Sequence, residues 1–352
     1  MFKISSKSIG IDLGTSTVVV YVHKKGIQLQ EPSVIVVGES KKNGNVMCFF
    51  GAKAKAMIGK TPGYLTALRP IRKGVIIDID ATLMMLNHLI LQIMSRSKVQ
   101  GLKLVVGVPY NSTEVERNAV EKTCKMAGAT EVYLLDEPVA AAIGAGLPIL
   151  ESTASFIVDI GGGTTEIAVL SIGGVVVGES LPIAGDAMDE VIIHMLKENY
   201  NLIIGENTAE AVKHTIGSVF PLSEEMQMEV KGRDNDTGLP KTILIGSEEV
   251  RSVLLVPAMA IVDVIKSTLN VTPAELCADL ITAGIALAGG GSLVRGFDKL
   301  LSSKIDLPVV YADEPATCVA RGAGEYLNLL NRKQKRKVNQ SMLNFAMSKR
   351  DK

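Results

Sequence analysis

The stretch "IVDIGGGTTEIAVL", residues 157–170, joins two apolar strands through three consecutive glycines and two threonines. A glycine turn lets the backbone adopt a positive φ and approach a ligand closely, and successive N–H groups in such a turn can bind an anion. The two threonine hydroxyls would add hydrogen-bond donors. We therefore interpret Gly161–Gly163 as a phosphate-binding turn. A plain tight hairpin is the alternative, and it would explain one or two of these glycines.

The same design occurs near the N-terminus, in "IGIDLGTSTVVVYVHKKG" (9–26). Asp12 and Gly14 there occupy the places of Asp159 and Gly161, and a third strand follows in both regions. A strand, a glycine turn and two further strands are typical of an antiparallel meander. The sequence therefore predicts two meanders of one design.

A second pair of segments matches in the same order. "DEPVAAAIGAG" (136–146) is similar to "DEPATCVARGAG" (313–324), and a strand–loop–helix unit precedes each. In the first of these units, Thr113 and Glu116 predict a helix-capping box. Two matches in one order indicate an internal duplication. We predict an α/β protein of two lobes, with mixed sheets flanked by helices and both glycine turns facing the cleft between them.

The two aspartates before the turns suggest a cation. A carboxylate beside a polyphosphate would repel it, unless a divalent ion lies between them. Asp12 and Asp159 are therefore candidate ligands of Mg²⁺, which takes oxygen ligands and often retains water. The alternative role for either side chain is to cap its turn.

Other functional classes find little support. "AKAMIGKT" (54–61) has alanine where a Walker-A loop needs its first glycine, and no dinucleotide-binding G-x-G-x-x-G follows a strand. Four separated cysteines and four histidines have no zinc-ligand spacing, so we expect buried free thiols. Tryptophan is absent and aromatic residues make up 4%, which argues against nucleic-acid stacking platforms. We expect neither a signal peptide nor a membrane span.

These motifs resemble the actin/Hsp70/sugar-kinase ATPase superfamily, and within it the bacterial actin MreB family over about residues 8–330. "DLGTST" and "DIGGGTTE" are similar to its two phosphate hairpins, and "LAGGGSLVRGF" to its adenosine motif. The resemblance implies an actin-like, duplicated, two-lobed fold with mixed five-stranded sheets and nucleotide in the interdomain cleft. It divides the chain into subdomain IA (1–34, 73–147 and 312–332), IB (35–72), IIA (148–181 and 242–311), IIB (182–241) and a basic tail (333–352).

The resemblance also implies functional residues. Glu137 and Thr164 would hold the attacking water, with Asp159 beside them, and the ionised form of Glu137 would be favoured by its place at a helix N-terminus. Asp12 and Asp159 would bind Mg²⁺ through water. Ser16, Thr17 and Val18 replace the family's usual Ala-Asn-Thr, so an asparagine side chain and a hydroxyl are lost. The residues expected to bind ATP or ADP are Gly14, Thr15, Ser16, Thr17, Gly161, Gly162, Gly163, Glu210, Lys213, Gly289, Gly290, Gly291 and Ser292.

The resemblance implies an ATPase that polymerises head to tail into cytoskeletal filaments at the cytoplasmic face of the membrane, where they control cell shape or motility. The alternative is a metabolite kinase of the same superfamily. Residues 331–352 carry eight Lys/Arg and one Asp, so a tail of charge +7 follows a body of charge −7. The tail is either a solvated segment or an amphipathic lipid-binding helix with Val338, Met342, Phe345 and Ala346 on one face. Phe2, Ile4 and residues 97–102 are further candidates for lipid contact.

Overall fold

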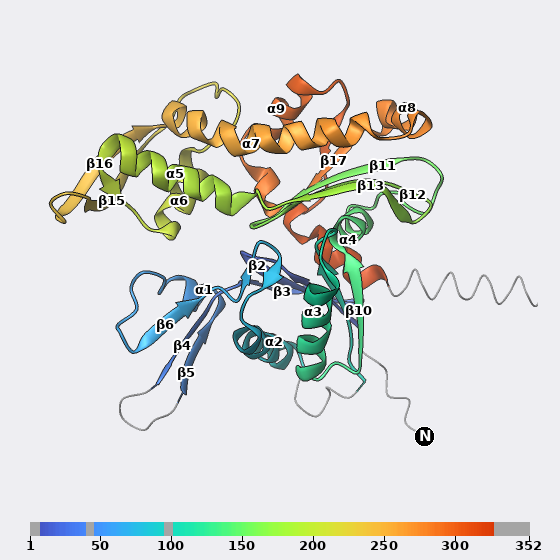
Figure 1. Ribbon diagram of the computed structural model, residues 1–352, viewed down its shortest axis with the longest axis horizontal. Helices are drawn as coiled ribbons and strands as arrows, with labels where there is room; N and C mark the ends of the chain where they lie inside the picture. Colours follow the sequence, from blue (N-terminus) through green and yellow to red (C-terminus); the bar gives the residue numbers. More distant parts are fainter. Residues whose placement is uncertain (1–7, 40–45, 95–100, 327–352) are drawn as a thin grey trace, which may run out of the picture.

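The computed structural model describes residues 8–39, 46–94 and 101–326, and its two largest sheets have the same topology (Figure 1). Their strand orders are β10-β9-β1-β2-β3 and β13-β12-β11-β17-β18. In each, three strands form an antiparallel meander, and two more strands add in parallel beside the first strand of that meander. The identical topology confirms the predicted duplication and its mixed five-stranded sheets.

The first sheet contains β1 (Ser8–Leu13), β2 (Thr17–Val22), β3 (Gly26–Pro32), β9 (Lys103–Val108) and β10 (Glu131–Asp136). The second contains β11 (Ser155–Ile160), β12 (Thr165–Ser171), β13 (Gly174–Leu181), β17 (Ile285–Ala288) and β18 (Val309–Tyr311). Central strands such as β11 are buried along their whole length, because both faces of the sheet are covered, so they are apolar rather than alternating.

The first lobe is built on the first sheet. Helices α2 (Ile79–Ile93) and α3 (Glu114–Met126) cover one face, and their side chains form a single core with β1, β2 and β9. The capping box predicted at the start of α3 is present. A smaller part of this lobe has the three-stranded sheet β5-β4-β6 beside α1 and the two-stranded sheet β7-β8. Its elements are β4 (Ile35–Glu39), β5 (Val46–Phe50), α1 (Gly51–Lys55), β6 (Leu65–Leu68), β7 (Ile71–Arg72) and β8 (Val75–Ile76).

The second lobe is built on the second sheet. Its main core joins that sheet to α5, α6, α7, α8 and α9, and the small sheet β14-β15-β16 packs beside α6. The elements are α5 (Gly185–Tyr200), β14 (Leu202–Ile203), α6 (Glu206–Ile216), β15 (Gln227–Asp234), β16 (Pro240–Gly246), α7 (Ser247–Asn270), α8 (Ala274–Ala283), η2 (Gly290–Leu293) and α9 (Phe297–Lys304).

Helix α7 is, among the described residues, the one helix long and apolar enough by length and composition to cross a membrane. Its residues Leu254, Ala258 and Ile261 are fully buried in the core of the second lobe, where α7 packs on β12 and β13. We therefore interpret its apolar composition as that of a core helix.

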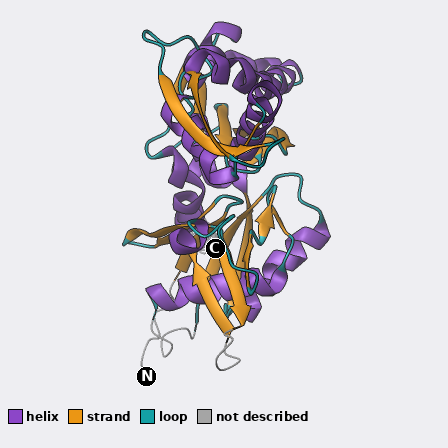
Figure 2. Cartoon of the chain, turned by 90° about the vertical axis from the view of Figure 1, so that its left-hand side faces the viewer, coloured by secondary structure: helices purple, strands orange, loops and turns teal. Residues whose placement is uncertain are grey.

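The two lobes, one above the other in Figure 2, are joined by a layer whose buried core is rich in alanine. It contains α4 (Glu137–Gly144), the turn η3 (Pro315–Thr317) and the helix at 318–326. A Cβ on Gly322 would lie 1.8 Å from the Ala140 carbonyl oxygen, and one on Gly144 would lie 1.9 Å from that of Cys318. The two Ala/Gly-rich segments that revealed the duplication therefore cross each other directly, and only glycine permits that approach.

Two expectations need qualification. Of the four free cysteines, Cys124 and Cys318 are buried as expected, but Cys48 and Cys277 are only partly buried. The basic tail, Phe2, Ile4 and most of the 97–102 loop lie outside the described residues. The division into four subdomains stays a prediction.

Candidate functional site

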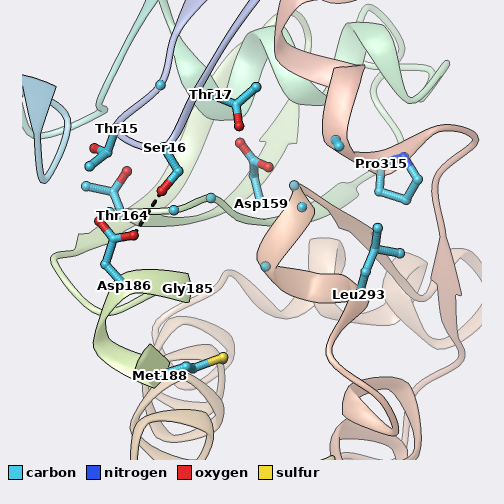
Figure 3. A pocket seen from close by; sticks show the side chains of 18 of the residues that line it. Thr15, Ser16, Thr17, Asp159, Thr164, Gly185, Asp186, Met188, Leu293 and Pro315 are labelled. Atoms are coloured by element: carbon cyan, nitrogen blue, oxygen red, sulfur yellow. Dashed lines mark hydrogen bonds between the residues drawn. The ribbon is translucent and has the colours of Figure 1, made fainter. Parts of the chain in front are cut away.

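A cavity of about 390 Å³ lies between the lobes, and both glycine-containing turns open onto it (Figure 3). Nearly all the candidate residues from the sequence line this one space. They are Asp12, Gly14, Thr15, Ser16, Thr17, Glu137, Asp159, Gly161, Gly162, Gly163, Thr164, Glu210, Lys213, Gly289, Gly290 and Gly291. Ser292 does not line the cavity, because its buried hydroxyl donates to the Gly289 carbonyl at 2.7 Å.

The three glycines of the second turn are explained by close packing. We expected positive φ angles, but none of Gly161, Gly162 and Gly163 has one, so that expectation was wrong. Instead, a Cβ on Gly162 would lie 2.2 Å from the Ser16 Oγ, and a Cβ on Gly163 would lie 2.4 Å from the Thr15 Oγ1. The two turns, one from each lobe, touch at these points. Glycine is needed because any side chain would separate them.

Ser16 links the lobes at the same place. Its hydroxyl donates to Asp186 Oδ1 at 2.9 Å, and Asp186 lies in the first turn of α5 (Figure 3). The Asp186 N–H in turn donates to the Gly162 carbonyl at 2.7 Å. The serine that departs from the family pattern therefore supplies a hydrogen bond across the cleft. Asp186 was not singled out from the sequence, because its partner is 170 residues away along the chain.

Four carboxyl groups lie at or beside the cavity, and all of them except the partly exposed Asp12 are buried. Burial raises the pKa of Asp12 to about 7. Burial and then the charge of Asp12 raise the pKa of Asp159 well above its usual value. The pKa of Glu137 is also raised well above its usual value, by burial first and then by the charges of Glu166 and its other acidic neighbours. We expected the α4 helix dipole to favour ionised Glu137; in the nucleotide-free protein, burial and like charges outweigh that dipole.

Glu166 completes this cluster and was not singled out from the sequence. It is opposite Asp159 in the β11–β12 ladder, where it accepts hydrogen bonds from the Tyr110 N–H at 3.1 Å and the Ser180 hydroxyl at 2.6 Å. Burial raises its pKa to about 7 despite these two bonds. The quoted "DIGGGTTE" contains this residue. Because successive side chains of a strand point to opposite faces of the sheet, Glu166 could have been placed on the face opposite to that of Thr165.

The carboxylates fit a cation bound mainly by water and ligand oxygens. Asp12 and Asp159 line the cavity and have raised pKa values that a nearby positive charge would lower. Within the described ranges there is no cluster of three or more acidic, histidine or cysteine side chains that could hold a metal by themselves. Two carboxylates with retained waters suit Mg²⁺, which rarely uses an all-protein cage.

The raised pKa of Asp12 predicts a stability effect. Between pH 4 and 7 the folded protein retains a proton that the unfolded chain has lost, so Asp12 increasingly destabilises the nucleotide-free protein as pH rises. We expect Asp12→Asn to raise the free energy of unfolding at pH 8 by about 1–4 kcal/mol, and by less at pH 5. Urea unfolding without nucleotide, at both pH values, measures this. A difference between variant and wild type that is independent of pH would contradict it.

The far end of the cavity is formed by the second lobe and the joining layer. Leu293 and Pro315 line it beside the Gly289–Gly291 turn, and Met188 lines it from α5 (Figure 3). Lys213 donates to the Gly185 carbonyl at 2.8 Å and pairs with Asp189 at 2.9 Å. These apolar and polar groups suit a ring system at one end of a ligand whose phosphates lie at the glycine turns. Met188, Asp189, Leu293 and Pro315 were not singled out, although Leu293 lies in the quoted "LAGGGSLVRGF" and Pro315 in "DEPATCVARGAG".

Comparison with known proteins gives the family. The family model described as MreB/Mbl protein matches residues 6–335. This chain belongs to the MreB/Mbl family. It is 44% identical over 328 residues to the cell shape-determining protein MreB of Escherichia coli K12, covering 93% of this chain and 94% of that protein. It is 41% identical over 333 residues to the cell shape-determining protein Mbl of Bacillus subtilis 168, and the match covers 95% of this chain and 99% of that protein.

Solved structures agree with this assignment to the MreB/Mbl family. The crystal structure of MreB5 of Spiroplasma citri bound to AMPPNP has a TM-score of 0.87 and 34% identity, covering 96% of this chain and 99% of that one. A chain of the MamK double helical filament has a TM-score of 0.77 at 24% identity, and the match covers 92% of this chain and 98% of that one. At this identity the likeness supports the fold and nothing further. The expected actin-like, two-lobed α/β fold is confirmed.

Proposed function

We propose that this MreB/Mbl protein binds ATP and Mg²⁺ in the interlobe cavity and hydrolyses the nucleotide. One observation carries the proposal: matched turns from the two duplicated sheets meet at one cavity that also holds buried carboxylates. The MreB5 relative from Spiroplasma citri has been crystallised with AMPPNP and with ADP. Backbone N–H groups of both turns would bind phosphates, and Asp12 and Asp159 would hold the cation through water. The cation would neutralise phosphate charge.

For hydrolysis, we assign Glu137 and Thr164 to the attacking water. Both line the cavity, from the first lobe's α4 and from the second turn. Phosphoryl transfer to water depends mainly on positioning and on charge stabilisation. The pKa of Glu137 would be lowered by a bound cation, so that its carboxylate accepts a hydrogen bond from the water while the Thr164 hydroxyl lies beside it, and this supplies that positioning. Asp159 lies beside them and is assigned to cation binding.

We further propose that the protein assembles head to tail into filaments that determine cell shape. Its relatives are named as cell shape-determining proteins. A contact between unlike surfaces of identical subunits does not close, so it generates a filament. The γ-phosphate would bridge the two turns and favour the closed cleft, so hydrolysis would shift the lobe equilibrium.

Sedimentation tests this function. We expect the protein to pellet above a critical concentration that is lower with ATP than with ADP, because ATP stabilises the closed lobes. Light scattering and electron microscopy of the same samples would identify filaments. Equal critical concentrations in the two nucleotides would contradict the proposed coupling. ATP-dependent phosphorylation of a metabolite without pelleting would favour the kinase alternative.

Membrane association is proposed for the basic tail. Each Lys or Arg near an anionic surface contributes about 1 kcal/mol, and the tail holds eight. We expect a chain truncated at Asn331 to bind vesicles containing phosphatidylglycerol at least about 10-fold more weakly than the full chain. Co-sedimentation measures this, with neutral phosphatidylcholine vesicles as the control. Equal binding by both chains would place the lipid contact elsewhere.

A further inference from the structure

Contacts between the lobes also occur outside the nucleotide cavity, between α6 and the small sheet of the first lobe. The Lys55 Nζ, at the end of α1, contacts both carboxylate oxygens of Glu210, at 2.8 and 2.6 Å. The Arg69 guanidinium, after β6, contacts Glu206 through two nitrogens, each at 3.0 Å. The Asn207 Nδ2 donates to the Lys55 carbonyl at 3.0 Å. Three α6 residues spaced along one helical face therefore hold the other lobe.

These contacts lie far from the layer that joins the lobes. In Figure 1, α1 and α6 are on the left side of the molecule, whereas α4 is near the point where the two lobes connect. Contacts at the open edge of a cleft resist its opening more effectively than contacts beside the hinge, because opening separates them farther. A second cavity, of about 130 Å³, lies along this edge and is lined by Lys55, Arg69, Glu206 and Glu210 together with Ser16 and Gly163. The edge contacts therefore border the phosphate end of the site.

The same helix also faces the nucleotide cavity. Glu210 lines both cavities, and Lys213, one turn later, lines the first. Burial alone would raise the pKa of Glu210, but the Lys55 ammonium more than offsets this and holds it below its usual value. We expected Glu210 to contact the nucleotide; in this structure its carboxylate contacts Lys55 of the opposite lobe while still lining the cavity. One short helix thus contacts the nucleotide site and the far lobe together.

We propose that α6 is an electrostatic clasp, in which Glu206, Asn207 and Glu210 bind Arg69 and Lys55 to hold the cleft closed and limit the rate of nucleotide release. This rests on the proposed function, since it requires a nucleotide in the cleft. The Arg69 side chain is 16% exposed and that of Glu206 is 49% exposed, so this pair is partly screened by solvent. Its effect is therefore expected to be modest and sensitive to salt.

The test is the dissociation rate of a fluorescent ATP analogue, chased with unlabelled ATP and Mg²⁺ in a stopped-flow instrument. Protein concentrations are kept below the threshold for pelleting, so that filament contacts do not contribute. We expect Arg69→Glu and Glu206→Arg each to speed release by about 3- to 10-fold. The double exchange, Arg69→Glu with Glu206→Arg, should return the rate to within about 2-fold of wild type, because it restores an ion pair.

Salt gives an independent readout. Between 0.1 and 1 M NaCl the Debye length falls from about 10 to about 3 Å, so wild-type release should become several-fold faster. The Glu206→Gln variant, which lacks the charge but keeps the side-chain size, should respond less to salt. Lys125→Ala is the matched control, because Lys125 forms its ion pair with Glu121 of the same helix, α3. It should release nucleotide at the wild-type rate.

Unchanged release in both single exchanges would overturn the clasp, as would faster release that the double exchange fails to restore. These outcomes are distinct from failure of the proposed function. If the wild-type protein bound no ATP analogue, the nucleotide proposal itself would fail. If it bound the analogue normally and the exchanges had no effect, only the clasp would be wrong.

Discussion

Replacing Glu137 with alanine is expected to slow ATP hydrolysis by about 10²- to 10⁴-fold, the usual effect of removing a positioned acid or base. Glu137 is the buried carboxyl group that α4 contributes to the cavity lining. Nucleotide affinity should change little, because the phosphates would be bound by the turns. Acid-quench measurement of phosphate formation in a single turnover, together with equilibrium binding of the fluorescent analogue, gives both quantities.

The internal duplication supplies the control. Glu314 occupies the matching position in the second Asp-Glu-Pro segment, but its side chain is 65% exposed and lies near Arg321. Glu137→Gln should therefore lose activity nearly as Glu137→Ala does, whereas Glu314→Gln should hydrolyse ATP at close to the wild-type rate. A Glu137 variant with normal hydrolysis would remove this residue from the mechanism. Equal losses in Glu137→Gln and Glu314→Gln would point to a general structural effect.

Replacing Gly162 with valine is expected to weaken ATP binding by about 5- to 150-fold. An added Cβ would lie 2.2 Å from the Ser16 Oγ and 2.6 Å from the Ser16 Cβ, so the neighbouring residue has no room to yield. Forcing atoms into a packed contact typically costs about 1–3 kcal/mol, and each 1.4 kcal/mol is a factor of ten in affinity. Gly162 and Ser16 belong to different lobes. Each lobe can therefore remain folded while the closed cleft is lost.

Gly174→Ala is the matched control in the same sheet, because a Cβ there meets no atom within 4 Å. It should bind ATP as the wild type does. Circular dichroism and thermal unfolding without nucleotide would show that both variants fold. Wild-type affinity in Gly162→Val would mean that the two turns do not have to touch when nucleotide is bound. The interpretation of the triple glycine would then have to change.

Much of the fold was predictable because its signals are local or repeated. The two meanders, their hairpin turns at Gly26 and Gly173, and the capping box at Thr113 were all read from short patterns, and the structure confirms them. The glycine turns and the two aspartates at the cavity followed from motifs at strand ends in the same way, whereas Glu210 and Lys213, within α6, followed from the family resemblance. We expected Ser292 in the cavity because its neighbours Gly289–Gly291 line it. The tight turn instead directs the Ser292 hydroxyl back to the Gly289 carbonyl.

The sequence by itself determined the duplicated topology and the positions of the two turns, because apolar runs, glycines and caps act on the chain within a few residues. Only the tertiary structure decided which side chains meet across the cleft. It brings Ser16 to Asp186, Lys55 to Glu210, and Glu137 into a cluster of like charges. A hydrogen bond, an ion pair or a raised pKa depends on distance and burial in space. Those quantities are set by the packing of two lobes, and no local pattern encodes them.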